Sequence, residues 1–250
     1  MSRSNPRTTN PAAHFIGWSG SEGVLSYWDK EAKEDVPVEF PFTFLVLDEL
    51  NTVRGFQDST KSGFFANEVR DVTKDEISVR TRKGLAGKGL WAELKNITGT
   101  KYAKSIYIAM KDDTGELILA NLTLSGAALT AWIDFNKTYN VYKGAVTIVG
   151  AGPEQKKGAT TFFAPEFKGV NVSDETDAAA TALDAQLQEY LNDYFNRKDS
   201  IDEAVVIEDF DEEDEAEESA PAPQKKRAAP APKAEEEEEE KPIDLSEVPF

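Results

Sequence analysis

The composition of this 250-residue chain changes abruptly near residue 200. Residues 208–218 include nine acidic side chains, a stretch rich in Pro, Ala and Lys follows, and Glu fills positions 235–240 without interruption. Such a segment has too few apolar side chains to offset the entropy lost on ordering. The sequence therefore predicts a disordered acidic tail over 201–250, so any packed core has to be built from the residues before it.

The formal net charge of −18 is concentrated in the same part of the chain. Residues 1–170 carry 21 basic and 20 acidic side chains, whereas residues 171–250 carry 7 and 26. The region expected to fold is therefore close to neutral. This balance disfavours a protein that mimics DNA, because a mimic needs acidic side chains on its folded surface.

Several classes of protein are disfavoured by the residue types that are missing. The chain has no Cys and a single histidine, His14, so we expect no disulfide framework, no metal site, no thiol catalysis and no cofactor. No apolar run is long enough to cross a membrane, and the N-terminus has no apolar stretch typical of a secretion signal. We expect a non-enzymatic, cytoplasmic protein that has no contact with a membrane.

Short, glycine-punctuated apolar segments over residues 15–200 predict one mainly β domain, preceded by a flexible arm at 1–14. The apolar run at 42–47 predicts a buried strand that extends through Phe56. Residues 77–82 alternate with period two, which places Ser78, Arg80 and Arg82 on one face of a strand. Three glycines in seven residues predict a loop over 83–89. The spacing of apolar residues predicts an inserted helix at 125–136, with Leu129, Trp132 and Ile133 on its buried stripe, and a C-terminal helix after Ser173.

Apolar residues return at the end of the acidic tail, in the order Glu247, Val248, Pro249 and Phe250. Phe250 offers an aromatic ring and a carboxylate at one residue, which an apolar pocket with a neighbouring basic side chain can bind. Pro249 restricts the chain and lowers the entropy lost on docking. These four residues are the predicted partner-binding tip.

The tip resembles the C-terminal peptide of bacterial single-stranded DNA-binding proteins, which ends in acidic residues followed by Ile-Pro-Phe; here Val248 stands in place of Ile. Residues 15–18 and 42–49 are similar to segments of phage-encoded proteins of this kind. The resemblance implies an OB-fold-like barrel with inserted and C-terminal helices. It also implies sequence-independent binding of single-stranded DNA in phage DNA replication, recombination and repair, in the cytoplasm of an infected bacterial host. In that family the tail competes with DNA and recruits replication proteins such as polymerase, helicase or primase.

Residues 80–104 support this interpretation independently, because they contain seven basic side chains and one acidic side chain. Single-strand binders combine cations that follow the phosphates with flat side chains that stack on bases, at about 1–3 kcal/mol per base. Tyr107 lies in an alternating strand whose other face is aliphatic, so we expect its ring to face outward. The candidate DNA-binding residues are Arg80, Arg82, Lys83, Lys88, Trp91, Lys95, Lys101, Tyr102, Lys104 and Tyr107.

The main alternative is an acidic-tailed interaction or assembly scaffold protein that does not bind nucleic acid. Such a protein would share the tail but would not need the basic stretch at 80–104. The sequence leaves the oligomeric state open and is compatible with a homo-oligomer.

Deletion of residues 208–250 should tighten the binding of single-stranded DNA, most clearly at low salt, because it removes an anion that competes with the strand. A fluorescence titration with oligo-dT on the full-length and shortened chains measures this difference. Equal or weaker affinity of the shortened chain would contradict the predicted competition.

Overall fold

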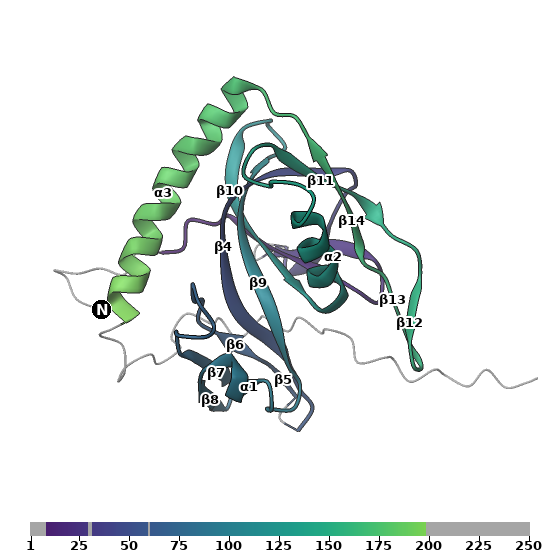
Figure 1. The fold of residues 1–250 in the computed structure, drawn as a ribbon, viewed down its shortest axis with the longest axis vertical. Coiled ribbons are helices and arrows are strands. Elements are labelled where there is room, and N and C mark those ends of the chain that lie inside the picture. Colours follow the sequence, from purple (N-terminus) through teal and green to yellow (C-terminus); the bar gives the residue numbers. More distant parts are fainter. Residues whose placement is uncertain (1–8, 30–31, 60, 199–250) are drawn as a thin grey trace, which may run out of the picture. The chain divides into compact units, whose positions relative to one another are not determined.

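The computed structural model describes residues 9–29, 32–59 and 61–198, which form a mainly β structure with three helices (Figure 1). The predicted tail over 201–250 and its tip lie outside the described residues. The strands are β1 (His14–Ser19), β2 (Val24–Asp29), β3 (Glu34–Val38), β4 (Phe42–Gln57), β5 (Ser62–Gly63), β6 (Phe65–Ala66), β7 (Ile77–Thr81), β8 (Gly84–Gly89), β9 (Thr100–Lys111), β10 (Leu117–Ser125), β11 (Ala145–Ala151), β12 (Gln155–Lys157), β13 (Thr160–Phe162) and β14 (Pro165–Val170). The helices are α1 (Trp91–Leu94), α2 (Gly126–Asn136) and α3 (Asp174–Lys198).

The largest sheet has the strand order β14-β11-β4-β9-β10-β1-β2-β3, with β5 pairing separately to the far end of β4. Its neighbours are antiparallel except β1 and β10, which run parallel. β4 extends through Phe56, so the predicted long strand is confirmed. The two longest strands, β4 and β9, pair along most of their length, from Phe44 opposite Met110 to Gly55 opposite Thr100. This ladder connects the large sheet to the β5–β8 region (Figure 1).

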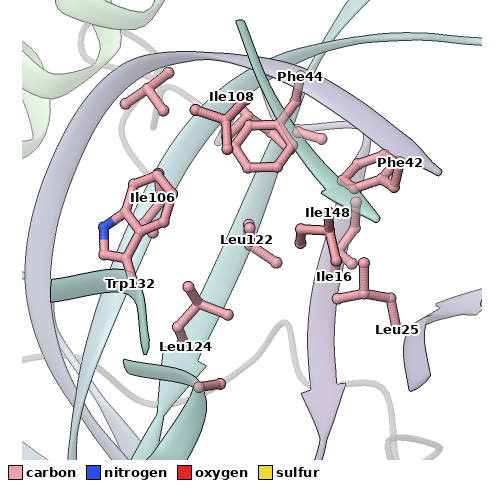
Figure 2. Packing of buried hydrophobic residues seen from close by; sticks show 14 of the residues in the cluster. Ile16, Leu25, Phe42, Phe44, Ile106, Ile108, Leu122, Leu124, Trp132 and Ile148 are labelled. Atoms are coloured by element: carbon pink, nitrogen blue, oxygen red, sulfur yellow. The ribbon is translucent and has the colours of Figure 1, made fainter. Parts of the chain in front are cut away.

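The main core lies on the side of the sheet that α2 covers (Figure 2). Figure 2 shows Trp132 of α2 directed at the aliphatic side chains of β9 and β10, with Phe44 of β4 close by. The rings of Trp132 and Phe44 are both fully buried, with centroids 6.3 Å apart. The predicted helix at 125–136 is confirmed, but its stripe is narrower than expected. Leu129 and Trp132 are buried, whereas Ile133 is 43% exposed because it lies 100° around the helix from Trp132.

The sheet does not close, so the predicted OB-fold-like barrel is not seen as a continuous ring of paired strands. β14 and β3 remain its two edge strands. Two hydrogen bonds nevertheless join the end regions of the sheet. The Phe163 N–H donates to Gly20 O at 2.7 Å, and Trp18 Nε1 donates to Phe163 O at 3.0 Å. These bonds link the β1–β2 turn to the loop before β14, which is a contact between turns and not a strand pair.

A smaller lobe is built from β5 to β8 and α1, at the end of the β4–β9 ladder (Figure 1). Its core contains Val53 of β4 together with Phe64, Ile77, Val79 and Leu94. The expectation of a loop over 83–89 is wrong, because residues 84–89 form β8 and pair with β7. Gly87 serves packing, because a Cβ there would lie 2.6 Å from Ile97 Cδ1 and Ile97 would have to shift, whereas Gly84 has a positive φ of 122°.

Replacing Phe44 with Ala should lower the free energy of unfolding by about 3–5 kcal/mol, because a buried aromatic ring leaves a cavity when it is removed. Urea denaturation followed by circular dichroism measures the change. Phe15→Ala is the matched control, since the Phe15 side chain is 50% exposed and should change stability by less than about 0.5 kcal/mol. Equal effects of the two substitutions would contradict this placement of the core.

Candidate functional site

Four of the ten candidate binding residues lie on β9 and are divided between the two faces of the β4–β9 ladder, namely Lys101, Tyr102, Lys104 and Tyr107. Successive side chains of a strand point to opposite faces, so odd and even residues of β9 separate. Even residues such as Tyr102 and Ile106 face the core below α2, and this side is the α2 face. Odd residues such as Tyr107 pack under α3 with Leu187 and Leu191, and this side is the α3 face. Lys101 therefore belongs to the α3 face, whereas Tyr102 and Lys104 belong to the α2 face.

On the α3 face, strand register aligns basic and apolar side chains in one line across five strands. Lys101 of β9 is opposite Arg54 of β4. The chain at 62–64 runs antiparallel to β4, with Phe56 opposite Gly63 and a hydrogen bond of 2.8 Å from Phe64 N to Gly55 O. Continued by one residue, this register sets Phe65 beside Arg54, and the contact between β4 and β6 agrees with it.

The line continues through the three-stranded sheet β6-β7-β8. Phe65 is opposite Arg80, and Arg80 is in turn opposite Leu85, whose side chain is 61% exposed. Directly opposed residues share a face of a sheet. The cross-strand row is thus defined in order as Lys101, Arg54, Phe65, Arg80 and Leu85.

Three more candidate residues lie on the β7–β8 hairpin next to the row. Arg82 and Lys83 form its exposed turn. Lys88 is opposite Ser78, two residues from Arg80, and shares its face; its ammonium lies 3.5 Å from Glu76. The predicted alternation of β7 is confirmed, since Ile77, Val79 and Thr81 are buried on the other face. Arg80, Arg82, Lys83, Lys88 and Lys101 are therefore brought together.

The remaining aromatic candidates are on the opposite side of the smaller lobe. Trp91 of α1 packs against the smaller core, and its ring centroid is 5.8 Å from that of Tyr102. Trp91 and Lys95 line a shallow cavity of about 270 Å³ together with Val72, Thr73, Leu90 and Ala92. The Tyr102 hydroxyl donates to Asn51 Oδ1 at 2.5 Å, so this hydroxyl makes a hydrogen bond within the protein. These residues do not join the cross-strand row.

Lys104 is held inside the structure by an acidic partner. Its ammonium lies 3.2 Å from Glu49 Oε2, and the two side chains are 22% and 13% exposed. The other Glu49 oxygen accepts a hydrogen bond of 2.9 Å from Trp132 Nε1. The basic stretch seen in the sequence thus contains at least one cation that stabilises the fold instead of facing a ligand.

Tyr107 does not face outward, because both faces of β9 are covered. Its side chain is fully buried on the α3 face, where α3 and the segment at 67–70 pack over it. The Tyr107 hydroxyl donates to Glu68 Oε2 at 2.8 Å and accepts from Asn10 Nδ2 at 3.1 Å. Asn10 belongs to the predicted flexible arm, and the described part of that arm docks here. The outward orientation expected from the aliphatic pattern is therefore wrong.

Glu68 is the centre of a buried polar network below α3. Its carboxyl group accepts from Tyr107 and from the Ser105 hydroxyl, and Ser105 in turn accepts from Asn121 Nδ2 at 2.6 Å. Burial raises the pKa of Glu68 above its ordinary value, and the hydrogen bonds from Ser105 and Tyr107 offset only part of that rise. Burial also raises the pKa of Tyr107, with a further contribution from the Glu68 charge.

The last turns of α3 hold the Glu68 segment in place. The Tyr194 hydroxyl accepts the backbone N–H of Glu68 at 2.9 Å. Arg70 Nη1 donates to Asp48 Oδ1 at 2.5 Å, and Gln188 of α3 donates to the other Asp48 oxygen at 3.0 Å. Although burial raises the pKa of Asp48, the bonds from Arg70 and Gln188 outweigh it and leave this pKa below the ordinary value.

Sequence analysis missed Arg54, Phe65, Leu85 and Glu68. Arg54 lies outside the basic stretch, and Phe65 and Leu85 carry no charge. Only the register of β4, β6 and β8 brings these three residues to Arg80. A partial signal existed for Arg54, because it is the one basic residue of the long strand predicted to run from 42 through Phe56. For Glu68 no pattern separates a buried carboxyl from an exposed one.

Within residues 9–29, 32–59 and 61–198, no group of three His, Cys, Asp or Glu side chains is arranged to hold a metal ion. Across the same ranges, each helix is too short or too polar to cross a membrane. A comparison with protein-family models, curated proteins and solved structures found no match, so function has to be inferred from the residues themselves.

Tyr107→Phe should lower the free energy of unfolding by about 1–3 kcal/mol, because it removes the hydroxyl that joins Glu68 to Asn10 and leaves buried polar groups without a partner. Urea denaturation at pH 7 measures the loss. Tyr142→Phe is the control, since the Tyr142 side chain is 57% exposed and should change stability by less than about 0.5 kcal/mol. A neutral Tyr107→Phe would contradict the network.

Proposed function

We propose that the chain is a single-stranded DNA-binding protein that uses the cross-strand row without reading base sequence. The observation that carries the proposal is the row of three cations and two apolar side chains, with Arg82 and Lys83 at the adjacent turn; in order the row is Lys101, Arg54, Phe65, Arg80 and Leu85. A phosphate backbone needs cations along a path, and bases need flat or apolar surfaces between them. The row supplies both kinds of side chain along one line.

The dimensions of the row suit an extended strand. Neighbouring strands of a sheet are about 4.8 Å apart, so five strands carry the row over roughly 19 Å. A nucleic-acid strand lying across the β-strands would meet cations at Lys101, Arg54 and Arg80 and apolar side chains at Phe65 and Leu85. The side chains placed between the cations, Phe65 and Leu85, have no hydrogen-bonding group that could distinguish one base edge from another, which favours binding independent of sequence.

The like charges of Arg54 and Lys101 support an anionic ligand at this place. Like charges directly opposite each other on two strands are destabilising. A phosphate placed between them converts this repulsion into attraction to both cations. Binding of a polyanion at this surface would explain why two cations that repel each other are placed on neighbouring strands.

The finer features implied by the family resemblance belong to the proposal as well. A curved β-sheet with an inserted helix could bind a strand as an OB-fold does, without a closed ring of strands. The acidic tail has the charge needed to compete with DNA for the row. Its tip would recruit replication proteins during phage DNA replication, recombination and repair. Tail and tip lie outside the described residues, and their support is the sequence alone.

The double variant Arg80→Gln/Lys101→Gln should bind oligo-dT about 10- to 100-fold more weakly at low salt, because two charged contacts to phosphates are lost. The slope of log affinity against log salt should become shallower by about 1.4, since each single-strand phosphate contact contributes about 0.7. Lys111→Gln is the matched control, because Lys111 is an exposed lysine at the other end of β9. Anisotropy of labelled dT oligomers across a salt series measures both quantities.

Unchanged affinity of the double variant, with folding verified by circular dichroism, would reject the row as the binding surface. Absence of oligo-dT binding by the wild-type chain, also after removal of residues 208–250, would reject nucleic-acid binding and favour the acidic-tailed scaffold.

A further inference from the structure

β1, β2 and β3 carry a second line of side chains that crosses neighbouring strands. The register that places Gly17 of β1 opposite Ser26 of β2 sets Phe15 beside Trp28, two residues along each strand. Trp28 is in turn opposite Asp35 of β3. Directly opposed residues share a face of a sheet. Phe15, Trp28 and Asp35 therefore form one line across three strands, which we call the outer row.

The outer row lies on the face of the sheet that is turned away from the main core. Ile16 of β1 and Leu25 of β2 are buried in that core, and successive side chains alternate, so Phe15 and Trp28 point the other way. Neither ring belongs to an apolar cluster of the described residues, and the Phe15 side chain is 50% exposed. The helices chiefly contact other strands: α2 packs on β9, β10 and β14, and α3 packs on β4 and β10. The described residues thus leave most of this face uncovered.

Trp28 differs from the other three tryptophans of the chain, all of which are described. The indole nitrogens of Trp18 and Trp132 donate hydrogen bonds of 3.0 and 2.9 Å within the protein, and Trp91 packs against the smaller core. The Trp28 side chain is partly exposed and makes no hydrogen bond or ring contact with any described residue. An indole with an open ring face and an unused N–H is typical of a surface that binds another protein.

The line of residues next to the outer row has small side chains. Gly17 is opposite Ser26, and Ser26 is opposite Pro37. A Cβ added at Gly17 would meet no atom within 4 Å, so there is open space above this residue. A side chain of a partner therefore has room to lie over Gly17 and against the flank of the Phe15 ring.

The charge around the outer row is negative. Asp35 is exposed and has no ion-pair partner in the part of the chain that the structure describes. Residues 14–29 and 32–39 contain five acidic side chains and one basic side chain, which repel a phosphate and attract a cation. An arginine guanidinium stacks on tryptophan and pairs with a carboxylate. Opposed residues such as Trp28 and Asp35 have Cβ atoms about 5 Å apart, so one arginine can reach both.

We propose that the outer row is a docking surface for a basic polypeptide segment of another protein, in which an arginine side chain stacks on Trp28 and pairs with Asp35. Phe15 covers the aliphatic stem of the segment next to Gly17. The outer row shares no residue with the cross-strand row, so this proposal does not depend on the proposed function.

Fluorine NMR of the full-length chain labelled with fluorotryptophan tests the proposal, because the four tryptophans give separate resonances. The probe is the peptide Gly-Arg-Gly-Arg-Gly with blocked ends, at about 0.15 M salt, where weak attraction between distant charges is screened. The Trp28 resonance, assigned by its loss in Trp28→Phe, should move with this peptide. It should stay in place with the same peptide carrying citrulline, which has the shape of arginine without the charge. The resonances of Trp18, Trp91 and Trp132 should stay in place with both.

Asp35→Asn should weaken the peptide affinity obtained from the Trp28 resonance by about three- to fivefold, because the ion pair is lost. Glu34→Gln is the matched control, since it removes the same charge from the adjacent, exposed position on the opposite face of β3, and it should change the affinity by less than about twofold. The acidic tail attracts the peptide equally in both variants and leaves their ratio unchanged. Unshifted resonances of the other tryptophans verify that the variants fold.

A Trp28 resonance that does not move, or that moves equally with the citrulline peptide, would overturn the docking surface. Equal weakening by Asp35→Asn and Glu34→Gln would also overturn it, because the attraction would then come from general acidity. Movement of the Trp28 resonance with oligo-dT and not with the arginine peptide would assign this face to the nucleic-acid strand instead of a protein partner.

Discussion

The antiparallel pairing of β4 with β9 determines most of what this chain can do. It runs from Phe44 opposite Met110 to Gly55 opposite Thr100, with one irregularity between Val46 and Asp48. That bulge exchanges the faces of β4, so the aromatic side chain of Phe44 and the carboxylate of Glu49 both reach the side that α2 covers. A register displaced by one residue would transfer every side chain to the other face. Both cores, the Glu68 network and the cross-strand row depend on this ladder.

The same ladder explains which charges contribute to the fold and which remain at the surface. Glu49 binds Lys104 on the α2 face, and Asp48 binds Arg70 and Gln188 on the α3 face. These pairs are partly buried and hold α2 and α3 to the sheet. Farther along the ladder, beyond both helices, Arg54 and Lys101 face each other with the same sign. The near-neutral balance of the folded region therefore includes opposite charges that pair under α2 and α3 and two cations that are opposite each other in the strand register.

The local sequence pattern predicted burial correctly where each strand packs as its own periodicity indicates. The apolar run of β4 predicted a long buried strand and the alternation of β7 predicted one buried face, and the structure confirms both. The predicted outward orientation of Tyr107 was wrong because both faces of β9 are covered. The sequence pattern of β9 does not reveal that α3, much later in the chain, packs on its second face. The prediction of a loop over 83–89 was wrong because a glycine in this strand, Gly87, lies close to Ile97 and does not mark a loop. The row could not be predicted at all, since it requires the registers of four strand pairs at once.

Two arrangements in this fold are unfavourable when each is considered by itself. A carboxyl group is buried at Glu68, and two cations are opposed at Arg54 and Lys101. Burial of an ionised carboxylate is costly unless it is compensated, and opposed like charges weaken a sheet. Hydrogen bonds from Ser105 and Tyr107 compensate the buried Glu68 carboxyl group in part. Local choices that contradict folding stability tend to mark functional sites. The opposed cations lie at the far end of the β4–β9 ladder, and an anionic strand bound there, as proposed, would weaken their repulsion.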